Sequence, residues 1–318
     1  MPPKKKKEAE PKTESERLVQ AMRKKFGSDD VALLMKEGGF ARVRSVCPTG
    51  IDVIDRHVIG IGGLPYGRGI ELKGDESSGK TTLLSKFMAA AQHDGCVVAF
   101  ADAEQKYDPA WGALHGLNLA EVVQLQSETL EAFHEEAMFV VEKQKRVMVA
   151  LDSIAAIPTE VEMKEGKHLP AEHARLWSQF LRPFKKLVQE KQALVVFVNQ
   201  IRMKIGVMFG NPETTFAGNA LRHFYSLRLH VSHGKTIKDN GVHQARYMHV
   251  RADKNHMAPP FRSAQLKLDY AKGFDEEWST INYAKEVGCI DADAKVIESS
   301  YLEAKKNLGW AEETEVPK

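Results

Sequence analysis

Short apolar runs alternate with amphipathic stretches along the chain from about residue 45 onward. The apolar runs cover residues 69–72, 96–100, 147–151 and 193–198. Between them, apolar side chains recur at helical spacing over residues 80–92, 130–143 and 172–191. Runs of this kind predict strands that are buried on both faces, and strands that alternate with helices predict a mostly parallel sheet. The pattern therefore predicts an α/β fold in which helices flank the sheet.

The later part of the chain has a different pattern. Residues 227–232 and 246–253 predict adjacent strands that are joined by a polar loop rich in glycine, lysine and aspartate. After about residue 275 we expect only a short C-terminal tail, which ends in the acidic residues Glu312, Glu313 and Glu315.

The first 44 residues precede this alternation. Lysines and prolines dominate residues 1–12, which predicts a disordered basic tail. Thr13 and Glu16 have the spacing of a capping box, and Gly27 suits a helix end, so we expect a helix between them. Residues 31–35 predict a strand. Because neither segment has enough apolar surface to fold alone, we expect both to pack on the core or on a neighbouring subunit.

Composition narrows the possible classes of protein. Hydrophobic residues make up 43% of the 318 residues, which suits a globular chain with a sizeable core. The formal net charge is only +2, so a nucleic-acid site would have to be a local basic patch. We expect no membrane span, because no apolar run approaches about 18 residues. The cysteines favour a reducing, cytoplasmic location and give no metal site, because they are widely separated, at Cys47, Cys96 and Cys289.

Residues 74–81 match the phosphate-binding motif G-x-x-x-x-G-K-[ST], and they lie between a predicted strand and a predicted helix. Gly74 and Gly79 let the backbone turn its N–H groups toward phosphate oxygens, next to the positive end of the helix. Lys80 supplies a cation to the β- and γ-phosphates, and Thr81 offers a hydroxyl to Mg²⁺. The motif therefore predicts a site for ATP and Mg²⁺. Its residues are Gly74, Asp75, Glu76, Ser77, Ser78, Gly79, Lys80, Thr81 and Thr82.

Two carboxylates follow predicted strands downstream of this loop. Asp152 ends the run at 147–151, which is the position of an acid that orients Mg²⁺-bound water. Glu104 lies just beyond the run at 96–100 and is our candidate to position or deprotonate the attacking water. Taken alone, each would equally suit an acidic residue in a surface turn, so both hypotheses depend on the phosphate-binding loop.

An amide pair, Asn199 and Gln200, ends the fourth apolar run, and a loop over residues 201–215 follows it. Gln200 can reach a γ-phosphate and report whether it is present. The loop combines glycine and proline with cationic and apolar side chains that suit phosphates and bases. An ordinary active-site loop is the alternative, but the position next to a nucleotide sensor favours an ATP-gated DNA-binding loop. Its candidate contacts are Arg202, Met203, Lys204, Ile205, Gly206, Met208, Phe209, Gly210 and Asn211.

Residues 199–219 closely resemble the second DNA-binding loop of the RecA family of recombinases. Several other segments are similar to motifs of that family: Glu76 to Thr82, Asp102 to Glu104 with Asp108 and Pro109, Gly62 to Pro65, and Lys254 and Asn255 with Pro260 and Phe261. The resemblance covers roughly residues 45–275. It implies a P-loop NTPase core of the RecA type. A generic hexameric helicase shares such a core but lacks this second loop.

The resemblance also implies an activity. Members of this family are DNA-dependent ATPases that form a helical filament on single-stranded DNA, pair it with homologous double-stranded DNA and exchange strands in recombination and repair. ATP would lie between subunits, where Glu104 would activate water, Gln200 would sense the γ-phosphate and Asp152 would assist Mg²⁺. Residues 13–44 resemble the arm that docks on a neighbouring subunit. The expected organisation is a tail at 1–12, an oligomerisation segment at 13–44, the ATPase core at 45–275 and a short region at 276–318.

Some further roles come from the resemblance alone. Asp108 and Trp111 align with residues that hold the adenine, and Trp111 stands in place of the usual tyrosine. Arg175 and Arg182 align with arginines that contact DNA, on the helix after the first loop. The first loop itself, about residues 160–172, diverges from the family.

Three departures from the family pattern motivate an alternative. Asp75 replaces a proline, and the C-terminal region is short for the family. Lys254 matches a lysine that reaches the neighbouring subunit's ATP, but His256 replaces the second lysine of that pair. An accessory protein that binds ATP and DNA without catalysis would tolerate these changes. A recombinase remains the first reading, because the catalytic set of Lys80, Thr81, Glu104, Asp152 and Gln200 is complete.

Overall fold

The structure is a computed structural model that describes residues 13–27, 43–203, 213–216 and 218–310. The chain divides into two units, Met1–Arg44 and Ser45–Lys318. The first unit contains helix α1 (Glu14–Phe26), which begins at the predicted Thr13 capping box and ends at Gly27. The tail expected at 1–12 and the strand expected at 31–35 lie outside the described residues. Within the described part of the chain, no helix has the length and apolar character needed to cross a bilayer.

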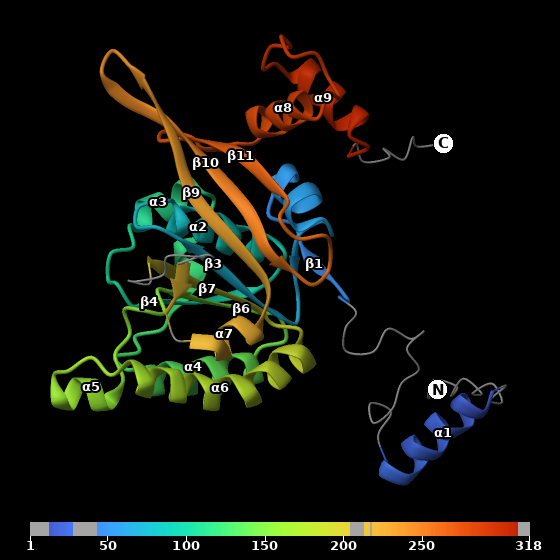
Figure 1. The fold of residues 1–318 in the computed structure, drawn as a ribbon, viewed down its shortest axis with the longest axis vertical. Coiled ribbons are helices and arrows are strands. Elements are labelled where there is room, and N and C mark those ends of the chain that lie inside the picture. Colours follow the sequence, from blue (N-terminus) through green and yellow to red (C-terminus); the bar gives the residue numbers. More distant parts are fainter. Residues whose placement is uncertain (1–12, 28–42, 204–212, 217, 311–318) are drawn as a thin grey trace. The chain divides into compact units, whose positions relative to one another are not determined.

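The second unit is built on one large sheet (Figure 1). Its strands lie in the order β12-β11-β10-β9-β3-β7-β6-β4-β5, and β8 pairs with β7 off this path. From β9 to β5 the neighbours are parallel, whereas β10, β11 and β12 add antiparallel strands at one side. The bounds are β3 Arg68–Gly74, β4 Val97–Asp102, β5 Val122–Gln124, β6 Val147–Asp152, β7 Leu194–Met203, β8 Glu213–Thr215, β9 Tyr225–Asp239, β10 Val242–Asn255, β11 Ser263–Asp269 and β12 Gly273–Asp275.

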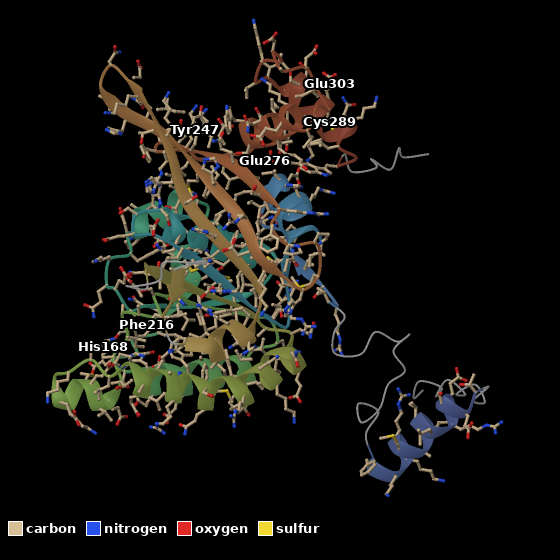
Figure 2. All side chains as sticks on the ribbon, viewed as in Figure 1. His168, Phe216, Tyr247, Glu276, Cys289 and Glu303 are labelled. Carbon is tan, nitrogen blue, oxygen red and sulfur yellow. The ribbon has the colours of Figure 1, made fainter. Side chains whose placement is uncertain are left out.

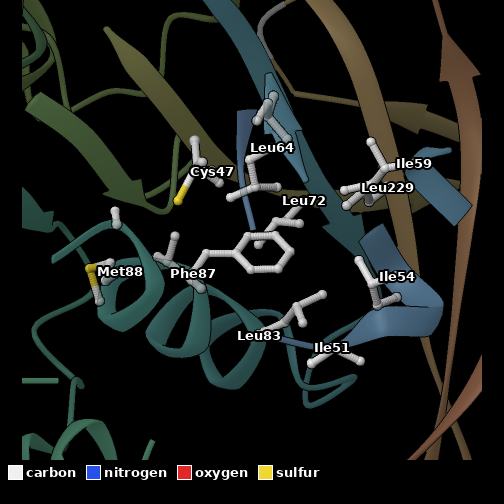
Figure 3. Close-up of a cluster of buried hydrophobic side chains, with 14 of the residues drawn as sticks. Cys47, Ile51, Ile54, Ile59, Leu64, Leu72, Leu83, Phe87, Met88 and Leu229 are labelled. Atoms are coloured by element: carbon white, nitrogen blue, oxygen red, sulfur yellow. The ribbon is translucent and has the colours of Figure 1, made fainter. Parts of the chain in front are cut away.

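Helices cover both faces of this sheet, which confirms the predicted α/β architecture (Figure 1). On one face, α2 packs together with a π-helical turn, η3, and Figure 3 shows Phe87 of α2 among the side chains of this core. On the other face lie α4, α6 and α7. Successive residues of β6 serve opposite cores: Met148 faces α2, and Val149 faces α4 and α6. The bounds are η3 Val53–Ile59, α2 Lys80–His93, α4 Leu130–Lys143, α6 Pro170–Lys191 and α7 Gly218–Phe224.

Shorter elements complete the fold. Strands β1 and β2 form a separate antiparallel pair, and α8 and α9 follow β12. The bounds are β1 Val46–Cys47, β2 Leu64–Pro65, α3 Pro109–Leu114, η4 Leu119–Glu121, α5 Glu160–Glu165, α8 Glu276–Glu286 and α9 Glu298–Asn307.

Two expectations about the later part of the chain were wrong. The polar loop expected after residue 232 is instead the outer half of a long hairpin, because β9 continues to Asp239 and β10 begins at Val242. The connection is Asn240 and Gly241, both at positive φ, which suits a two-residue hairpin turn. The region after residue 275 is also no simple tail, because α8 and α9 pack together around Ile281, Ala284 and Ala304.

The core on the α4 face gives a first test. Phe133 of α4 is fully buried, and its ring lies 5.8 Å from Phe197 and 6.3 Å from Trp177 between centroids. We expect Phe133→Ala to lower the free energy of unfolding by about 3–5 kcal/mol, because it leaves a cavity among aromatic rings. Phe139→Ala on the same helix should change it by less than about 0.5 kcal/mol, since Phe139 is 60% exposed. Denaturant unfolding of both variants measures the difference, and equal midpoints would contradict it.

Candidate functional site

The phosphate-binding loop connects β3 to α2, at the carboxyl end of a central strand. Gly79 has φ +98°, and a side chain there would meet the Met248 methyl group at 2.6 Å. A side chain on Gly74 would collide with the carbonyl oxygen of Val231 in the neighbouring strand β9. Gly79 is therefore required by its backbone conformation, and Gly74 by the close approach of β9. The loop leads directly into the amino end of α2, where the partial positive charge of the helix lies.

Lys80 is the first residue of α2, and its side chain turns back over the loop. Its Nζ lies 2.6 Å from the carbonyl oxygen of Asp75 and donates to it. Burial lowers the pKa of the Lys80 ammonium, although Asp152 and Glu104 act in the opposite direction. Asp75, the departure from the family pattern, is exposed. The carboxylate of Asp75 is thus solvated. It does not pull the Lys80 ammonium out of the loop, because that ammonium binds the backbone carbonyl of Asp75 instead.

Thr81 and Asp152 meet beside Lys80. The Thr81 hydroxyl donates to the Oδ2 atom of Asp152 over 2.5 Å, which joins the start of α2 to the end of β6. Burial raises the pKa of Asp152 to about 6, against the hydrogen bond from Thr81 that lowers it. This donor set fits Mg²⁺, which prefers oxygen ligands and keeps several waters. A cation there would also stabilise the buried negative charge of Asp152.

Glu104 lies just after β4, where three strands bring their carboxyl ends together. Its Oε1 atom accepts hydrogen bonds from the Ser153 hydroxyl at 2.8 Å and from the Gln200 amide at 2.9 Å. Ser153 follows β6, joined to Asp152 by a cis peptide bond, and Gln200 belongs to β7. Sequence reasoning placed Glu104 and Gln200 near a phosphate separately. The structure adds that they contact each other directly and that Ser153 holds the carboxylate.

The segment after Glu104 supplies the remaining predicted nucleotide contacts. Asp108 caps α3 by accepting from the N–H of Ala110 at 2.9 Å. Trp111 of α3 is half-buried, and its indole N–H donates to the Thr82 hydroxyl over 3.1 Å. The predicted adenine residues therefore lie next to the phosphate-binding loop, and the indole is fixed in orientation by a residue of the motif itself.

Strand β10 places a cationic side chain against the same loop. The sequence analysis did not predict this residue. The guanidinium of Arg246 donates from Nη1 to the carbonyl oxygen of Ser77 over 2.9 Å. Ser77 and Glu76 are exposed, whereas Ser78 is fully buried. No local motif marks Arg246, since its position depends on the antiparallel pairing of β10 with β9 beside β3.

Lys254 does not meet Lys80 within one subunit. Its ammonium donates to the carbonyl oxygen of Arg222, ahead of the amino end of β9, whereas the phosphate-binding loop follows the carboxyl end of the parallel strand β3. The two cations thus lie at opposite ends of the parallel strands. His256 is exposed, and burial followed by the charge of Lys254 lowers its pKa, which keeps the imidazole neutral near pH 7.

The predicted DNA-binding segment begins and ends in an antiparallel pair. Strand β7 runs on through Gln200 to Met203, past the end expected from the sequence, and pairs Met203 with Glu213 of β8. Arg202 and Met203 therefore lie in the outgoing strand. The predicted contacts Lys204, Ile205, Gly206, Met208, Phe209, Gly210 and Asn211 lie outside the described residues.

Asn199 ties the base of this segment to the centre of the sheet. Its side chain accepts from the N–H of Phe216 and donates to the carbonyl oxygen of the same residue, at 3.3 and 3.4 Å. It also donates to Glu71 of β3 at 2.9 Å, and Glu71 pairs with Arg228 of β9. Sequence analysis gave the sensor role to Gln200 and none to Asn199. The structure shows that adjacent amides of β7 face two different networks.

Two further predicted DNA contacts lie on α6. Arg175 and Arg182 are both exposed. Arg175 forms a two-point ion pair with Glu172, with Nη2 at 2.5 Å and Nε at 2.9 Å from the carboxylate oxygens. A phosphate that binds Arg175 must therefore compete with Glu172.

Comparisons with known proteins identify the family of this chain. A family model described as the RecA N-terminal domain matches residues 14–275. A protein from Chloroflexus aggregans named "Protein RecA" is 38% identical over 269 residues, which cover 84% of this chain and 76% of the relative. Its namesake from Methylococcus capsulatus is 41% identical over 263 residues, covering 81% of this chain and 75% of the relative. The chain belongs to the RecA family. A Francisella philomiragia relative of the same name is 38% identical over 303 residues, which cover 94% of this chain and 82% of the relative.

Membership of the RecA family indicates the activity of the chain. It is an ATP-dependent recombinase of recombination and DNA repair, with DNA-dependent ATPase and strand-exchange activity. Like the RecA family in general, it binds nucleotide and DNA and forms oligomers. Nothing in these comparisons favours the accessory alternative.

Proposed function

We propose that ATP and Mg²⁺ bind at the carboxyl end of β3 and β6 and that the bound γ-phosphate controls the grip of residues 202–211 on DNA. The backbone of residues 74–79 would hold the phosphates, while Lys80 would neutralise the β- and γ-phosphates. Thr81 and Asp152 would hold Mg²⁺, which offsets charge on the phosphates. Asp108 and Trp111 would bind the adenine, on the side where Trp111 already contacts Thr82.

The observation that carries this proposal is the single carboxylate oxygen that Ser153 and Gln200 share. In the structure Gln200 donates to Oε1 of Glu104. A γ-phosphate offers the Gln200 amide a competing acceptor, and water held between phosphate and Glu104 offers the carboxylate a proton to accept. Gln200 would then leave Glu104 when ATP is bound and return after hydrolysis. Glu104 would thus act as the base, and Gln200 as the sensor.

A movement of Gln200 would be transmitted to the DNA contacts through the backbone of β7. Gln200 lies in the strand that continues to Arg202 and Met203, which we propose as DNA contacts together with the loop residues that follow. Arg175 and Arg182 on α6 would add phosphate contacts that carry no sequence preference. The expected partner is single-stranded DNA, bound by stacking and phosphate contacts, with a homologous duplex as the second partner.

We further propose the assembly that this site needs. The chain would form a helical filament in the cytoplasm, in which residues 13–44 dock on the next subunit, the core at 45–275 binds ATP and DNA, and 276–318 form a short C-terminal region. Lys254 would then reach the ATP of a neighbouring subunit, since within its own subunit it lies at the opposite end of the parallel strands. Electron microscopy with ATPγS and single-stranded DNA tests the assembly: long helical filaments support it, and closed rings contradict it.

Replacement of Gln200 by alanine tests the coupling. The affinity of the wild type for single-stranded DNA should be about 5–150-fold higher with ATPγS than with ADP, the range of ordinary coupling energies. In Gln200→Ala this ratio should fall toward one, because the γ-phosphate has lost its contact with β7. Fluorescence anisotropy of a labelled oligonucleotide measures both affinities. Gln144→Ala, an exposed amide after α4, is the matched control and should keep the ratio. An unchanged ratio in Gln200→Ala would remove Gln200 from the pathway.

A further inference from the structure

One carboxylate and two imidazoles converge where α5 turns back into α6. Glu162 belongs to α5, His168 to the connection and His173 to the start of α6. Oε1 of Glu162 lies 2.8 Å from Nδ1 of His168, and Oε2 lies 2.7 Å from Nε2 of His173. All three ligand atoms are within 4.8 Å of one another. The cluster uses none of the residues that the ATP site employs.

The carboxylate is buried and fixed in place. Glu162 is 7% exposed, and it accepts backbone hydrogen bonds from Thr159 at 2.9 Å and from Leu169 at 2.6 Å. Its orientation is set by the backbone before any ligand arrives.

The two imidazoles are held against one aromatic ring. His173 meets the edge of Phe216 with centroids 4.9 Å apart, and His168 stacks on Phe216 at 5.6 Å. His168 and Phe216 are labelled near each other in Figure 2. His173 is 1% exposed, whereas the His168 side chain is 51% exposed and leaves a path from solvent. The cluster is thus rigid on its inner side and open on its outer side.

The surroundings of His173 suit a metal ligand. The buried Nδ1 of His173 has no hydrogen-bond partner within the described residues, so it can carry the ring proton when Nε2 exchanges its hydrogen bond to Glu162 for a metal ion. Nε2 then presents a lone pair toward Glu162. Two imidazoles and one carboxylate form the ligand set of a known class of zinc site, with water in the fourth position.

We propose that Glu162, His168 and His173 bind a divalent transition-metal ion of the Zn²⁺ type. Ligand atoms around tetrahedral Zn²⁺ lie about 3.3 Å apart, as bond lengths of about 2.0–2.2 Å require. The two contacts of Glu162 would therefore open by only about half an ångström. Imidazole ligands favour such ions over Mg²⁺ and Ca²⁺. The bound ion would join α5, its connection and α6 above Phe216, whose backbone Asn199 ties to β7. This site goes beyond the proposed ATP and DNA functions and depends on neither.

Cobalt spectroscopy on the full chain tests the site. The protein is freed of metal with EDTA, saturated with Mg²⁺ and ADP so that Thr81 and Asp152 are occupied, and titrated with Co²⁺. We expect one equivalent with the intense visible bands of four- or five-coordinate Co²⁺, which one equivalent of Zn²⁺ displaces. His168→Ala should weaken Co²⁺ binding by at least about 10-fold and Glu162→Gln by about 100-fold, judged from losses at known metal sites. His93→Ala, which changes an exposed histidine of α2, should bind Co²⁺ as the wild type does.

The measurements distinguish loss of the metal site from loss of the fold. His168 is half-exposed, so His168→Ala should keep its fold, and its far-ultraviolet circular dichroism checks this. Zn²⁺ should also raise the melting temperature of the wild type, and raise that of His168→Ala by less at the same concentration. Wild-type protein without the intense bands, or a His168→Ala variant that keeps both the bands and their affinity, would overturn the proposal. Neither result would bear on ATP hydrolysis, which is measured separately.

Discussion

Replacing Glu104 by glutamine should lower the rate of ATP hydrolysis on single-stranded DNA by at least about 100-fold, the lower end of what a general base contributes. The variant should still bind ATP and DNA. Glutamine has nearly the shape of glutamate, and its amide oxygen can accept the same two hydrogen bonds, from Ser153 and Gln200. It cannot accept a proton from water. The loss should therefore appear in turnover and leave affinity almost unchanged.

Phosphate release in the presence of saturating single-stranded DNA measures turnover, and filter binding or anisotropy measures affinity. Glu121→Gln changes an exposed acid near β5 in the same way and should hydrolyse ATP at the wild-type rate. A Glu104→Gln variant that turns over normally would show that another group activates the water. A variant that loses nucleotide binding as well would give Glu104 a structural role instead.

Lys80→Ala should abolish most of the same activity, by about 10²–10³-fold in turnover, as expected when one stabilising donor is removed from developing phosphate charge. The buried ammonium now donates to Asp75 within the loop, which keeps a single cation at the place where the phosphates would bind. Alanine preserves the helix start because it is the strongest helix former. The backbone N–H groups remain, so weak nucleotide binding should persist.

Lys145→Ala, an exposed lysine in the turn before β6, is the charge-matched control and should keep full activity. Turnover is measured as phosphate release, and nucleotide affinity is measured with a fluorescent ATP analogue. A Lys80→Ala variant with normal turnover would mean that another cation takes over the phosphates, for which Arg246 beside Ser77 is a candidate.

The sequence predicts those site residues that lie together in one short segment of the chain. Gly74, Gly79, Lys80 and Thr81 lie in a single loop, so their spacing alone fixes the strand, the turn and the helix start. The helix at 130–143 was also predicted with its observed bounds, because its apolar stripe is a local signal. In each case the physical cause lies within a few residues of the effect.

Contacts between distant segments were beyond the same reasoning. Glu104 and Gln200 meet because β4, β6 and β7 are neighbours, and neither residue carries a sign of that order. Arg246 reaches Ser77 through the same kind of pairing. The outer half of the β9–β10 hairpin looked like a loop because it has no core to alternate against, so its residues are mostly polar on both faces. The histidines near α5 were passed over because their spacing matched no familiar motif.

The antiparallel pairing at the root of the proposed DNA-binding segment has a consequence for how that segment can change. Met203 and Glu213 are partners, and Asn199 fastens Phe216 just beyond them, so the entry and exit of residues 204–212 are brought together by the fold itself. The entropic cost of bringing the two ends of this segment together is therefore met once, when the protein folds. It does not have to be met again each time a ligand binds. Doubling its length would add only about 0.6 kcal/mol to that closure. Insertions between Met203 and Glu213 should consequently be tolerated by the ATPase site, which leaves this stretch open to variation while the nucleotide chemistry stays constant.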